Sequence, residues 1–311
     1  MKKILVIGST NIDFVVNVVD FPVAGETVMS QSFQKMPGGK GANQAYACGK
    51  LGGDTAFVSV IGDDGLGDLA MKNLKDERVN IDSVKTEPGT PTGLAQISID
   101  HSGNNCIIVV PGANSACNQE FIEEIYDRID ACDILLIQME TPLAGVLKAI
   151  QRAKQAGKTV ILNPAPVPEE PLPEELFNGL TYLTPNETEL GKLTGMPVDT
   201  FEEVCAAARK LLELGVEHVI VTLGEKGAAF INRETEVLYE TRKVEAVDTT
   251  AAGDTFNAAI AVFLSHAKTI EQAIRFANLA SGISVTRQGA QPSVPSREEV
   301  EALAGGDASG R

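Results

Sequence analysis

The sequence predicts an α/β fold: a doubly wound, mostly parallel sheet flanked by helices, with a second, smaller β-sheet beside it. Short apolar runs rich in β-branched residues alternate with segments of helical periodicity along most of the 311 residues. Such continuous apolar runs are typical of parallel strands that are covered on both faces. Two segments, 14–36 and 92–111, break this alternation because they are rich in β-forming residues and lack a helical period.

The predicted helices each carry one apolar face, and glycines mark several of their ends. In the helix predicted at 201–214, for example, Val204, Ala208 and Leu211 fall on one side. Gly195 follows a helical segment at the position where a left-handed stop is common. The predicted strands are 4–7, 56–61, 134–138, 159–162, 182–184 and 219–223, and the predicted helices are 41–51, 66–76, 119–130, 143–156, 201–214, 253–264 and 270–285.

The two segments that break the alternation predict a small sheet of their own. Residues 94–99 and 106–110 form a hairpin pattern that turns at 100–104. A small sheet made from two insertions has exposed edges and one apolar face, so it should cover a ligand site or a partner subunit. We therefore expect an α/β core of residues 1–13, 37–91 and 112–311, and a β lid of residues 14–36 and 92–111.

Composition excludes several classes of function. The formal net charge of -16 argues against a nucleic-acid surface or an anionic membrane face, although it leaves room for a single nucleotide. The five cysteines are scattered without a C-x-x-C pair, and the three histidines lack ligand spacing, so we expect reduced thiols and no zinc site. The apolar run near the N-terminus is too short for a signal peptide, and no run reaches the ~20 residues of a spanning helix. A cytoplasmic location is the expectation.

An acidic residue in the first turn of a helix is the leading candidate for a catalytic group. Residues 243–247 are predicted to form a strand that leads into Asp248–Thr250, and Ala251–Gly253 then open the helix. Small residues leave backbone amides accessible at the positive end of the helix, which favours an anion there. Asp254 could accept a proton from a hydroxyl nucleophile while these amides stabilise a transferring phosphoryl group. Alternatively, Asp254 only complements the helix dipole and the glycine permits close packing.

A glycine-rich segment, Met36–Asn43, opens another predicted helix. Three glycines within four residues let backbone amides approach a ligand, and Lys40 and Asn43 add side-chain donors. The segment is neither a Walker A loop nor a G-x-G-x-x-G fingerprint. Upstream, Asn11 and Asp13 alternate on one face of an extended segment, and an amide with a carboxylate suits sugar hydroxyls. An ordinary tight turn and a solvated loop are the alternatives for these two segments.

Two further motifs follow buried strands, at the edge of the sheet where open α/β folds bind ligands. Thr222–Gly227 is one, and it could equally be a plain hairpin turn. In the other, Asn186 and Glu189 lie one helical turn apart and could orient Mg2+ through water, or could simply cap a helix. No single motif decides the function, but their shared place at strand ends and helix starts favours one common site.

Together these motifs resemble the ribokinase family of carbohydrate kinases, and the resemblance covers roughly residues 4–303. Gly38–Asn43 and Asp248–Asp254 match two signatures of the family in order, and Asn186–Glu189 resembles its N-x-x-E motif. Further matching segments are 8–13, 139–142, 163–166 and 289–295. The resemblance implies a soluble enzyme that uses ATP to phosphorylate D-ribose at its 5-hydroxyl. A 2-deoxyribose or nucleoside kinase of the same family and a non-catalytic sugar or nucleotide sensor are the alternatives.

The resemblance also implies residue roles for the transferred group and the sugar. Asp254 would be the general base, and the amides of Ala252 and Gly253 would hold the phosphoryl group. Many relatives carry glycine where this chain has Ala251 or Ala252, and because alanine fits a helix start we expect no loss. The sugar pocket would comprise Asn11, Asp13, Gly39, Lys40, Asn43, Glu140 and Asp254.

The same resemblance implies sites for ATP, two cations and a second subunit. Glu189 would reach Mg2+ through water, and the lid sheet would pair two chains into a homodimer. ATP would contact Asn186, Thr222, Gly224, Gly227, Gly253 and Asn278. An activating monovalent cation, usually K+, would lie near Asp248, Thr250, Ser284, Arg287, Gly289 and Ser293, several of them through backbone carbonyls.

Overall fold

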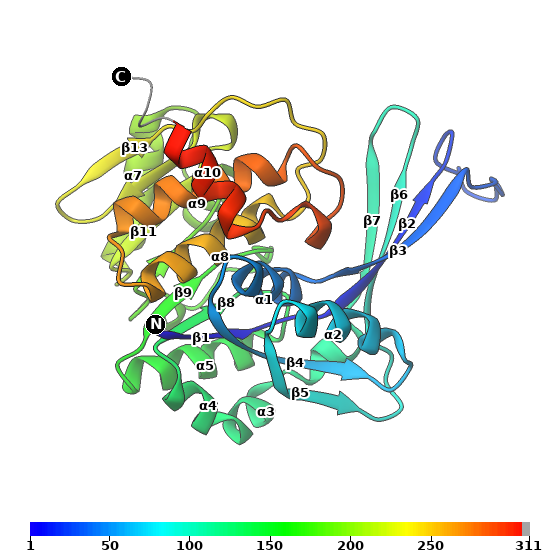
Figure 1. Ribbon diagram of the computed structural model, residues 1–311, viewed down its shortest axis with the longest axis horizontal. Coiled ribbons are helices and arrows are strands. Elements are labelled where there is room, and N and C mark those ends of the chain that lie inside the picture. Colours follow the sequence, from blue (N-terminus) through cyan, green and yellow to red (C-terminus); the bar gives the residue numbers. More distant parts are fainter. Residues whose placement is uncertain (307–311) are drawn as a thin grey trace.

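The computed structural model describes residues 1–306, so the end of the predicted core, 307–311, lies outside the described residues. Within that range, one large sheet has nine strands in the order β13-β12-β11-β10-β9-β8-β1-β4-β5 (Figure 1). The seven strands from β5 to β11 run parallel, and β12 and β13 are antiparallel additions at one edge. Their bounds are β1 Lys3–Ile7, β4 Asp54–Gly62, β5 Asn80–Glu87, β8 Ile134–Ile137, β9 Thr159–Leu162, β10 Tyr182–Leu183, β11 His218–Thr222, β12 Ala228–Ile231 and β13 Glu236–Tyr239.

Helices cover both faces of this sheet, as the apolar runs predicted. Along β1, Ile4 and Val6 pack into one core and Leu5 and Ile7 into the other, because successive side chains of a strand point to opposite faces. The first core is closed by α1 Lys40–Lys50, α2 Leu66–Asp76, α8 Ala252–Ser265, α9 Ile270–Ser284 and α10 Arg297–Gly306. The second is closed by α3 Gln119–Glu124, α4 Tyr126–Ala131, α5 Leu143–Gln155, α6 Glu187–Thr194 and α7 Phe201–Glu213.

A separate small sheet projects from one side of the molecule (Figure 1). Its four strands, all within the described residues, have the order β3-β2-β6-β7, with β2 and β6 parallel. The sheet reaches further toward the core than the predicted lid, since β2 starts at Asn11 and β3 ends at Gly38. Asn11 and Asp13 therefore lie on a strand and not on a loop. The bounds are β2 Asn11–Asn17, β3 Ser32–Gly38, β6 Gly93–Ile99 and β7 Asn105–Val110.

Most of the predicted elements are confirmed to within two residues, and two are wrong. The predicted helix 119–130 is two short helices, because at Ile125 the backbone switches to bonds three residues apart, with its N–H on the carbonyl of Ile122. The predicted strand 243–247 is irregular. Within residues 1–306 no strand pairs with it, and its end is held instead by the Val285 carbonyl, which accepts the N–H groups of residues 247 and 248.

Candidate active site

The ends of the central parallel strands and the starts of α1 and α8 meet at one place in the fold. Residues 8–11 follow β1, residues 138–140 follow β8, and the Gly-rich segment leads from β3 directly into α1. Helices α1 and α8 pack against each other on the same face of the sheet. This arrangement brings polar residues from distant parts of the sequence together, as expected for the carboxyl edge of a doubly wound sheet.

Asp254 is buried in the first turn of α8, and both oxygens of its carboxylate accept hydrogen bonds. Asn43 donates from Nδ2 to Oδ2 at 3.1 Å, and Gln44 donates from Nε2 to Oδ1 at 3.0 Å. Burial raises the pKa of the Asp254 carboxyl, while the charge of Lys40 and the two amide bonds act in the opposite direction. The carboxyl is thus an acceptor shielded from bulk water, with a pKa above its ordinary value. These are properties of a general base.

The segment before Asp254 differs from the prediction in one respect. Ala251 caps α8 in the left-handed region, at φ 59°, where alanine is strained and glycine is not. The expectation that alanine would cost nothing here is therefore wrong for Ala251. The N–H of Ala252 donates to the Thr249 carbonyl at 3.2 Å, whereas a side chain built at Gly253 would meet no atom within 4 Å. Both predicted phosphoryl-binding positions, Ala252 and Gly253, border the same cavity, and Gly253 does so without a side chain.

Three carboxylates and one ammonium group share the predicted sugar pocket. Glu140 accepts hydrogen bonds from the Ser9 hydroxyl at 2.6 Å and from the backbone N–H of Lys40 at 2.9 Å. Burial, together with the charges of Glu140 and Asp254, raises the pKa of Asp13 to about 7. Burial lowers the pKa of Lys40, but Asp254, Glu140 and Glu189 outweigh it and raise that pKa. Lys40 therefore stays charged, and Asp13 can exchange a proton near neutral pH.

Asn114 belongs to this pocket although the sequence did not single it out. It follows the small sheet, and its Nδ2 donates to Asn11 Oδ1 at 2.8 Å while its Oδ1 accepts the N–H of Thr10 at 2.8 Å. The bond directs the oxygen of Asn11 toward Asn114 and leaves the amide nitrogen of Asn11 as a donor. Gly39 lies beside the same strand end at φ 86°, and a Cβ there would stand 2.7 Å from the N of Asn11. A lone asparagine in a turn carries no motif, which explains why the sequence did not reveal it.

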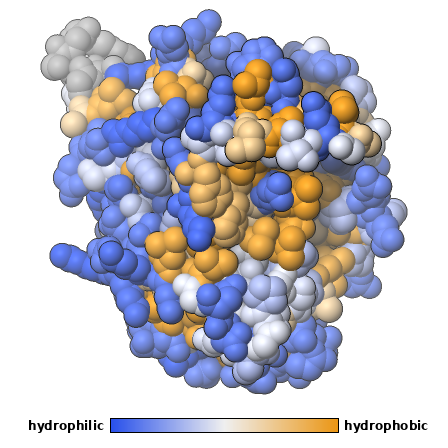
Figure 2. Space-filling view, turned by 90° about the vertical axis from the view of Figure 1, so that its right-hand side faces the viewer, coloured by the Kyte–Doolittle hydropathy of each residue, from blue (hydrophilic) through white to orange (hydrophobic). Residues whose placement is uncertain are grey.

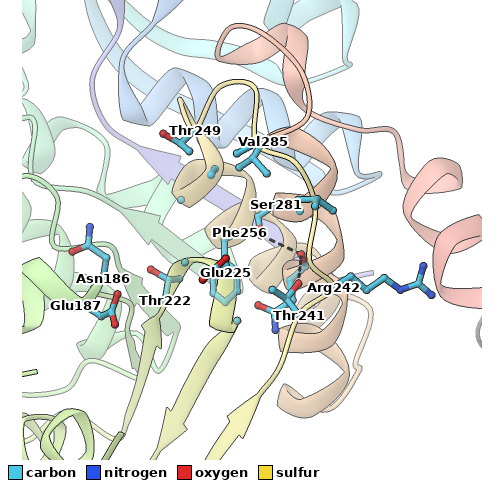
Figure 3. A pocket seen from close by; sticks show the side chains of 18 of the residues that line it. Asn186, Glu187, Thr222, Glu225, Thr241, Arg242, Thr249, Phe256, Ser281 and Val285 are labelled. Atoms are coloured by element: carbon cyan, nitrogen blue, oxygen red, sulfur yellow. Dashed lines mark hydrogen bonds between the residues drawn. The ribbon is translucent and has the colours of Figure 1, made fainter. Parts of the chain in front are cut away.

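A cavity of about 450 Å³ adjoins the first turn of α8. Figure 3 shows Asn186 and Thr222 on one side of it, Phe256 between, and Thr249 and Val285 on the other side. Asn278 also lines it, although its Nδ2 is used by the carbonyl of Tyr239 at 2.8 Å. All six residues predicted to contact ATP line this cavity: Asn186, Thr222, Gly224, Gly227, Gly253 and Asn278. Because Gly253 precedes Asp254, the cavity and the polar pocket meet at one helix turn.

Glu189 faces both a helix start and the carboxylate pocket. Asn186 and Glu189 form a reciprocal cap of α6, with Asn186 Oδ1 accepting from the N–H of Glu189 at 2.8 Å and Glu189 Oε2 accepting in return at 2.9 Å. Burial raises the pKa of Glu189, and among its other influences are Lys40 and Asp254. The capping interpretation of this motif is confirmed. The cap uses Oε2 of Glu189. The other oxygen of Glu189 is a candidate cation ligand, because Asp254 is among the charges that act on this residue.

Two of the residues predicted near a monovalent cation, Thr250 and Gly289, contact Asp248. Its two carboxylate oxygens accept the N–H groups of Thr250 and Gly289, each at 2.9 Å. The hydroxyls of Ser284 and Ser293 donate to backbone carbonyls, which leaves the lone pairs of their oxygens unused, and Arg287 pairs with Glu299. In residues 1–306 no group of three or more His, Cys, Asp or Glu side chains is placed to hold a metal ion. Backbone carbonyls, the Asp248 carboxylate and the two serine hydroxyls are therefore the oxygens that a cation could use here.

Three comparisons place this site in a known family. A model of the pfkB family of carbohydrate kinases matches residues 1–297. The chain is 40% identical to a protein named ribokinase from Haemophilus influenzae, over 96% of this chain and 97% of that one. It is 38% identical to a deoxyribokinase from Salmonella typhi, over 95% and 96% of the two chains.

The fold agrees with these sequence relations. The structure of Arabidopsis thaliana ribokinase complexed with ribose and ATP superimposes with a TM-score of 0.92 at 38% identity, covering 97% of this chain and 98% of that chain. In the part of the chain that the structure describes, no helix is both long and apolar enough to cross a membrane. The chain therefore belongs to the pfkB family of carbohydrate kinases.

Proposed function

We propose that this enzyme transfers the terminal phosphoryl group of ATP to the 5-hydroxyl of D-ribose, with Asp254 as the general base. The observation that carries the proposal is the position of Asp254, between a polar pocket suited to a sugar and a cavity of about 450 Å³. The ribokinases among the relatives, and the related structure that holds ribose and ATP, support this choice of substrates.

The pocket supplies each function that the transfer needs. Asn11 offers an amide donor and Asp13 a carboxylate acceptor, so together they can bind sugar hydroxyls, which both donate and accept. Asp254 accepts the proton of the attacking hydroxyl as the new bond to phosphorus forms. The N–H of Gly253 lies at the positive end of α8, where negative charge on the transferring group is stabilised. Burial of these groups strengthens their electrostatic effect.

Two cations fit the residues present. Mg2+ coordinates oxygen, keeps several waters and is usually held by substrate phosphates with one or two carboxylates, so the second oxygen of Glu189 suits a water-mediated role. Mg2+ supplies charge neutralisation at the phosphates when it is bound. K+ would take Asp248 and nearby backbone carbonyls, and it would order the turn that ties residue 248 to Gly289.

The small sheet and the cysteines support two further parts of the proposal. Every residue of β7 is exposed, and Figure 2, viewed from the side where the sheet lies, shows apolar side chains gathered across that face. We expect a second copy of the chain to cover the exposed apolar residues Phe33, Ile107, Ile108, Val109 and Val110. All five cysteines are free thiols, which suits a reducing, cytoplasmic location.

A deoxyribose kinase is the second candidate, and the deoxyribokinase at 38% identity favours it. The two sugars differ in a single hydroxyl, so the discrimination depends on whether a buried polar group of the pocket is left unpaired. A coupled assay of ADP release with D-ribose, 2-deoxy-D-ribose, D-fructose and adenosine separates the candidates. Ribose should give the highest kcat/KM, with ribose 5-phosphate as the product. A higher kcat/KM with deoxyribose would favour the second candidate, and no turnover with any acceptor would overturn the kinase proposal.

A further inference from the structure

Gln44 is a buried residue outside the predicted motifs, and its side chain makes hydrogen bonds to three other side chains. It lies on α1 beside Asn43, and none of its side chain is exposed. Its Nε2 donates to Asp254 Oδ1 at 3.0 Å and to Asn163 Oδ1 at 3.1 Å. Its Oε1 accepts from Gln138 Nε2 at 2.7 Å. Both N–H groups and the carbonyl oxygen of this amide are therefore used.

The hydrogen bonds around Gln44 continue across the strand ends and return to α8. Asn163 donates from Nδ2 to the carbonyl of Thr184, whose hydroxyl donates to Asn257 Oδ1 at 2.6 Å. Asn257 in turn donates from Nδ2 to the carbonyl of Gly253 at 2.9 Å. The network thus links the carboxylate of Asp254 to the preceding residue by a second route, past the ends of β9 and β10. Such a connected, buried network favours one fixed geometry.

The direction of the Gln44 amide is fixed by its partners. A flipped amide would place Oε1 against the oxygens of both Asp254 and Asn163, and would set its nitrogen against the donor of Gln138. All three contacts would be repulsive. Gln138 lies at the outer end of this arrangement, and among the described residues its own Oε1 has no partner. Gln44 therefore always presents a donor to the carboxylate.

We propose that Gln44 is a positioning residue that holds Oδ1 of Asp254, so that the carboxylate stays ionised and aimed at the hydroxyl of the sugar. The proposal rests on the proposed role of Asp254 as the base. Asn43 holds the other oxygen at 3.1 Å, so the two neighbouring amides of α1 fix the plane of the carboxylate. Each oxygen keeps a second lone pair that can accept the proton of the substrate.

Loss of the Gln44 donor should weaken the enzyme more at low pH than at high pH. A hydrogen bond to the charged form lowers the pKa of a carboxyl, so its removal lets the carboxyl protonate at higher pH. Four other charged groups act on Asp254: Lys40 on α1 favours the ionised form, while Asp13 on β2, Glu140 after β8 and Glu189 on α6 oppose it. Gln44 has no hydrogen bond to any of these four groups. Replacing Gln44 therefore removes one hydrogen bond to Asp254 and leaves the four charged groups with their own hydrogen bonds.

The test compares Gln44→Met with Gln138→Met, a control in which an equally buried glutamine one bond further from the carboxylate is replaced in the same way. For Gln44→Met we expect kcat/KM for ribose to fall about 30-fold near pH 6 and about fivefold near pH 8.5, with KM for ATP within about twofold. For Gln138→Met we expect a loss that is equal at both pH values. Melting temperatures of both variants report the purely structural cost.

A titration that does not depend on turnover separates this proposal from the role of Asp254. With 13C-labelled aspartate carboxyls, the Asp254 signal is assigned by its disappearance in Asp254→Asn. The signal should titrate at higher pH in Gln44→Met than in the natural chain, and unchanged in Gln138→Met. An unchanged titration, or an equal loss of kcat/KM at both pH values, overturns the proposal even if Asp254 is the base. Should Gln44→Met fail to fold, Asn163→Ala removes one of the two acceptors that hold the Gln44 nitrogen, both of which Gln138→Met leaves in place. The donor to Asp254 is then held less firmly, so the same pH-weighted loss is expected at smaller size, and a pH-independent loss there overturns the proposal.

Discussion

Replacing Asp13 by asparagine should stabilise the folded chain, and the gain should grow with pH. Asp13 is held in the folded state with a pKa of about 7, against an ordinary value of 3.8, because it is buried among other carboxylates. A folded pKa above the unfolded one means that the neutral form is favoured by folding. The stabilisation that folding gains from the neutral Asp13 carboxyl is complete below the unfolded pKa and is lost as pH rises through about 7. An asparagine side chain stays neutral at every pH, so Asp13→Asn avoids this loss.

The size of the effect follows from the two pKa values. A difference of roughly 3 pH units corresponds to about 4 kcal/mol at high pH, since one unit is about 1.36 kcal/mol. Near pH 5 only about 1.5 kcal/mol of this has been lost, because the solution is little more than one unit above the unfolded pKa. The gain in the free energy of unfolding on Asp13→Asn should therefore be about 2 to 3 kcal/mol larger near pH 8 than near pH 5.

Urea denaturation followed by far-UV circular dichroism measures this gain at the two pH values. Asp199→Asn, at an exposed position, is the control for loss of one negative charge at the surface. The comparison of variant with natural chain at the same pH cancels the titration of all other groups. An Asp13→Asn gain of the same size near pH 5 and near pH 8 would refute the reasoning, because the neutral form of Asp13 would then not be favoured by folding.

The helix start, the cation site and the small sheet each give a further prediction. Ala251→Gly should raise Tm by about 1 °C in calorimetry, because it removes left-handed strain of about 1 kcal/mol from a chain of this length, and a lower Tm would contradict the strain. K+ should raise kcat above its value in Na+ or without added cation, since it would order the turn at Asp248, and a flat response would exclude this cation site. Ile108→Lys, at a position 59% exposed on β7, should convert a dimer to a monomer in light scattering, and a natural chain that is already monomeric would exclude the pairing.

Local sequence patterns predicted the helices and strands well where an apolar pattern has clear boundaries. The helix at Leu66–Asp76 and the strand at Thr159–Leu162 have the predicted bounds, because each is an apolar pattern bounded by polar or glycine residues. The predicted strand 243–247 is absent, although its sequence has strand-like alternation, because a strand also needs a partner and none of the described strands lies beside it. Pairing is a property of the whole fold and cannot be deduced from five residues.

Some residues of the candidate site could likewise be predicted from local sequence, and others could not. Asp254, Asn186 and Thr222 could be predicted because each lies in a motif at a strand end or a helix start. Gln44 and Asn114 could not, because each acts through a partner that is distant in sequence: Gln44 bonds Asp254, and Asn114 bonds the end of β2. A hint exists for Gln44, since it is a polar residue in a helix whose buried positions are mostly glycine, alanine and cysteine. Only the folded structure supplies its partner.

The measurement that tests the central claim most directly is the activity of Asp254→Asn beside its affinity for ribose. Asparagine has nearly the same shape as aspartate but cannot accept a proton at neutral pH, and its one oxygen keeps one of the two hydrogen bonds from α1. We predict that ribose binding, measured by calorimetry, changes by a few-fold at most, while kcat falls by ~10^2-fold or more. A variant that binds ribose normally and retains the kcat of the natural chain would contradict the assignment of Asp254 as the base.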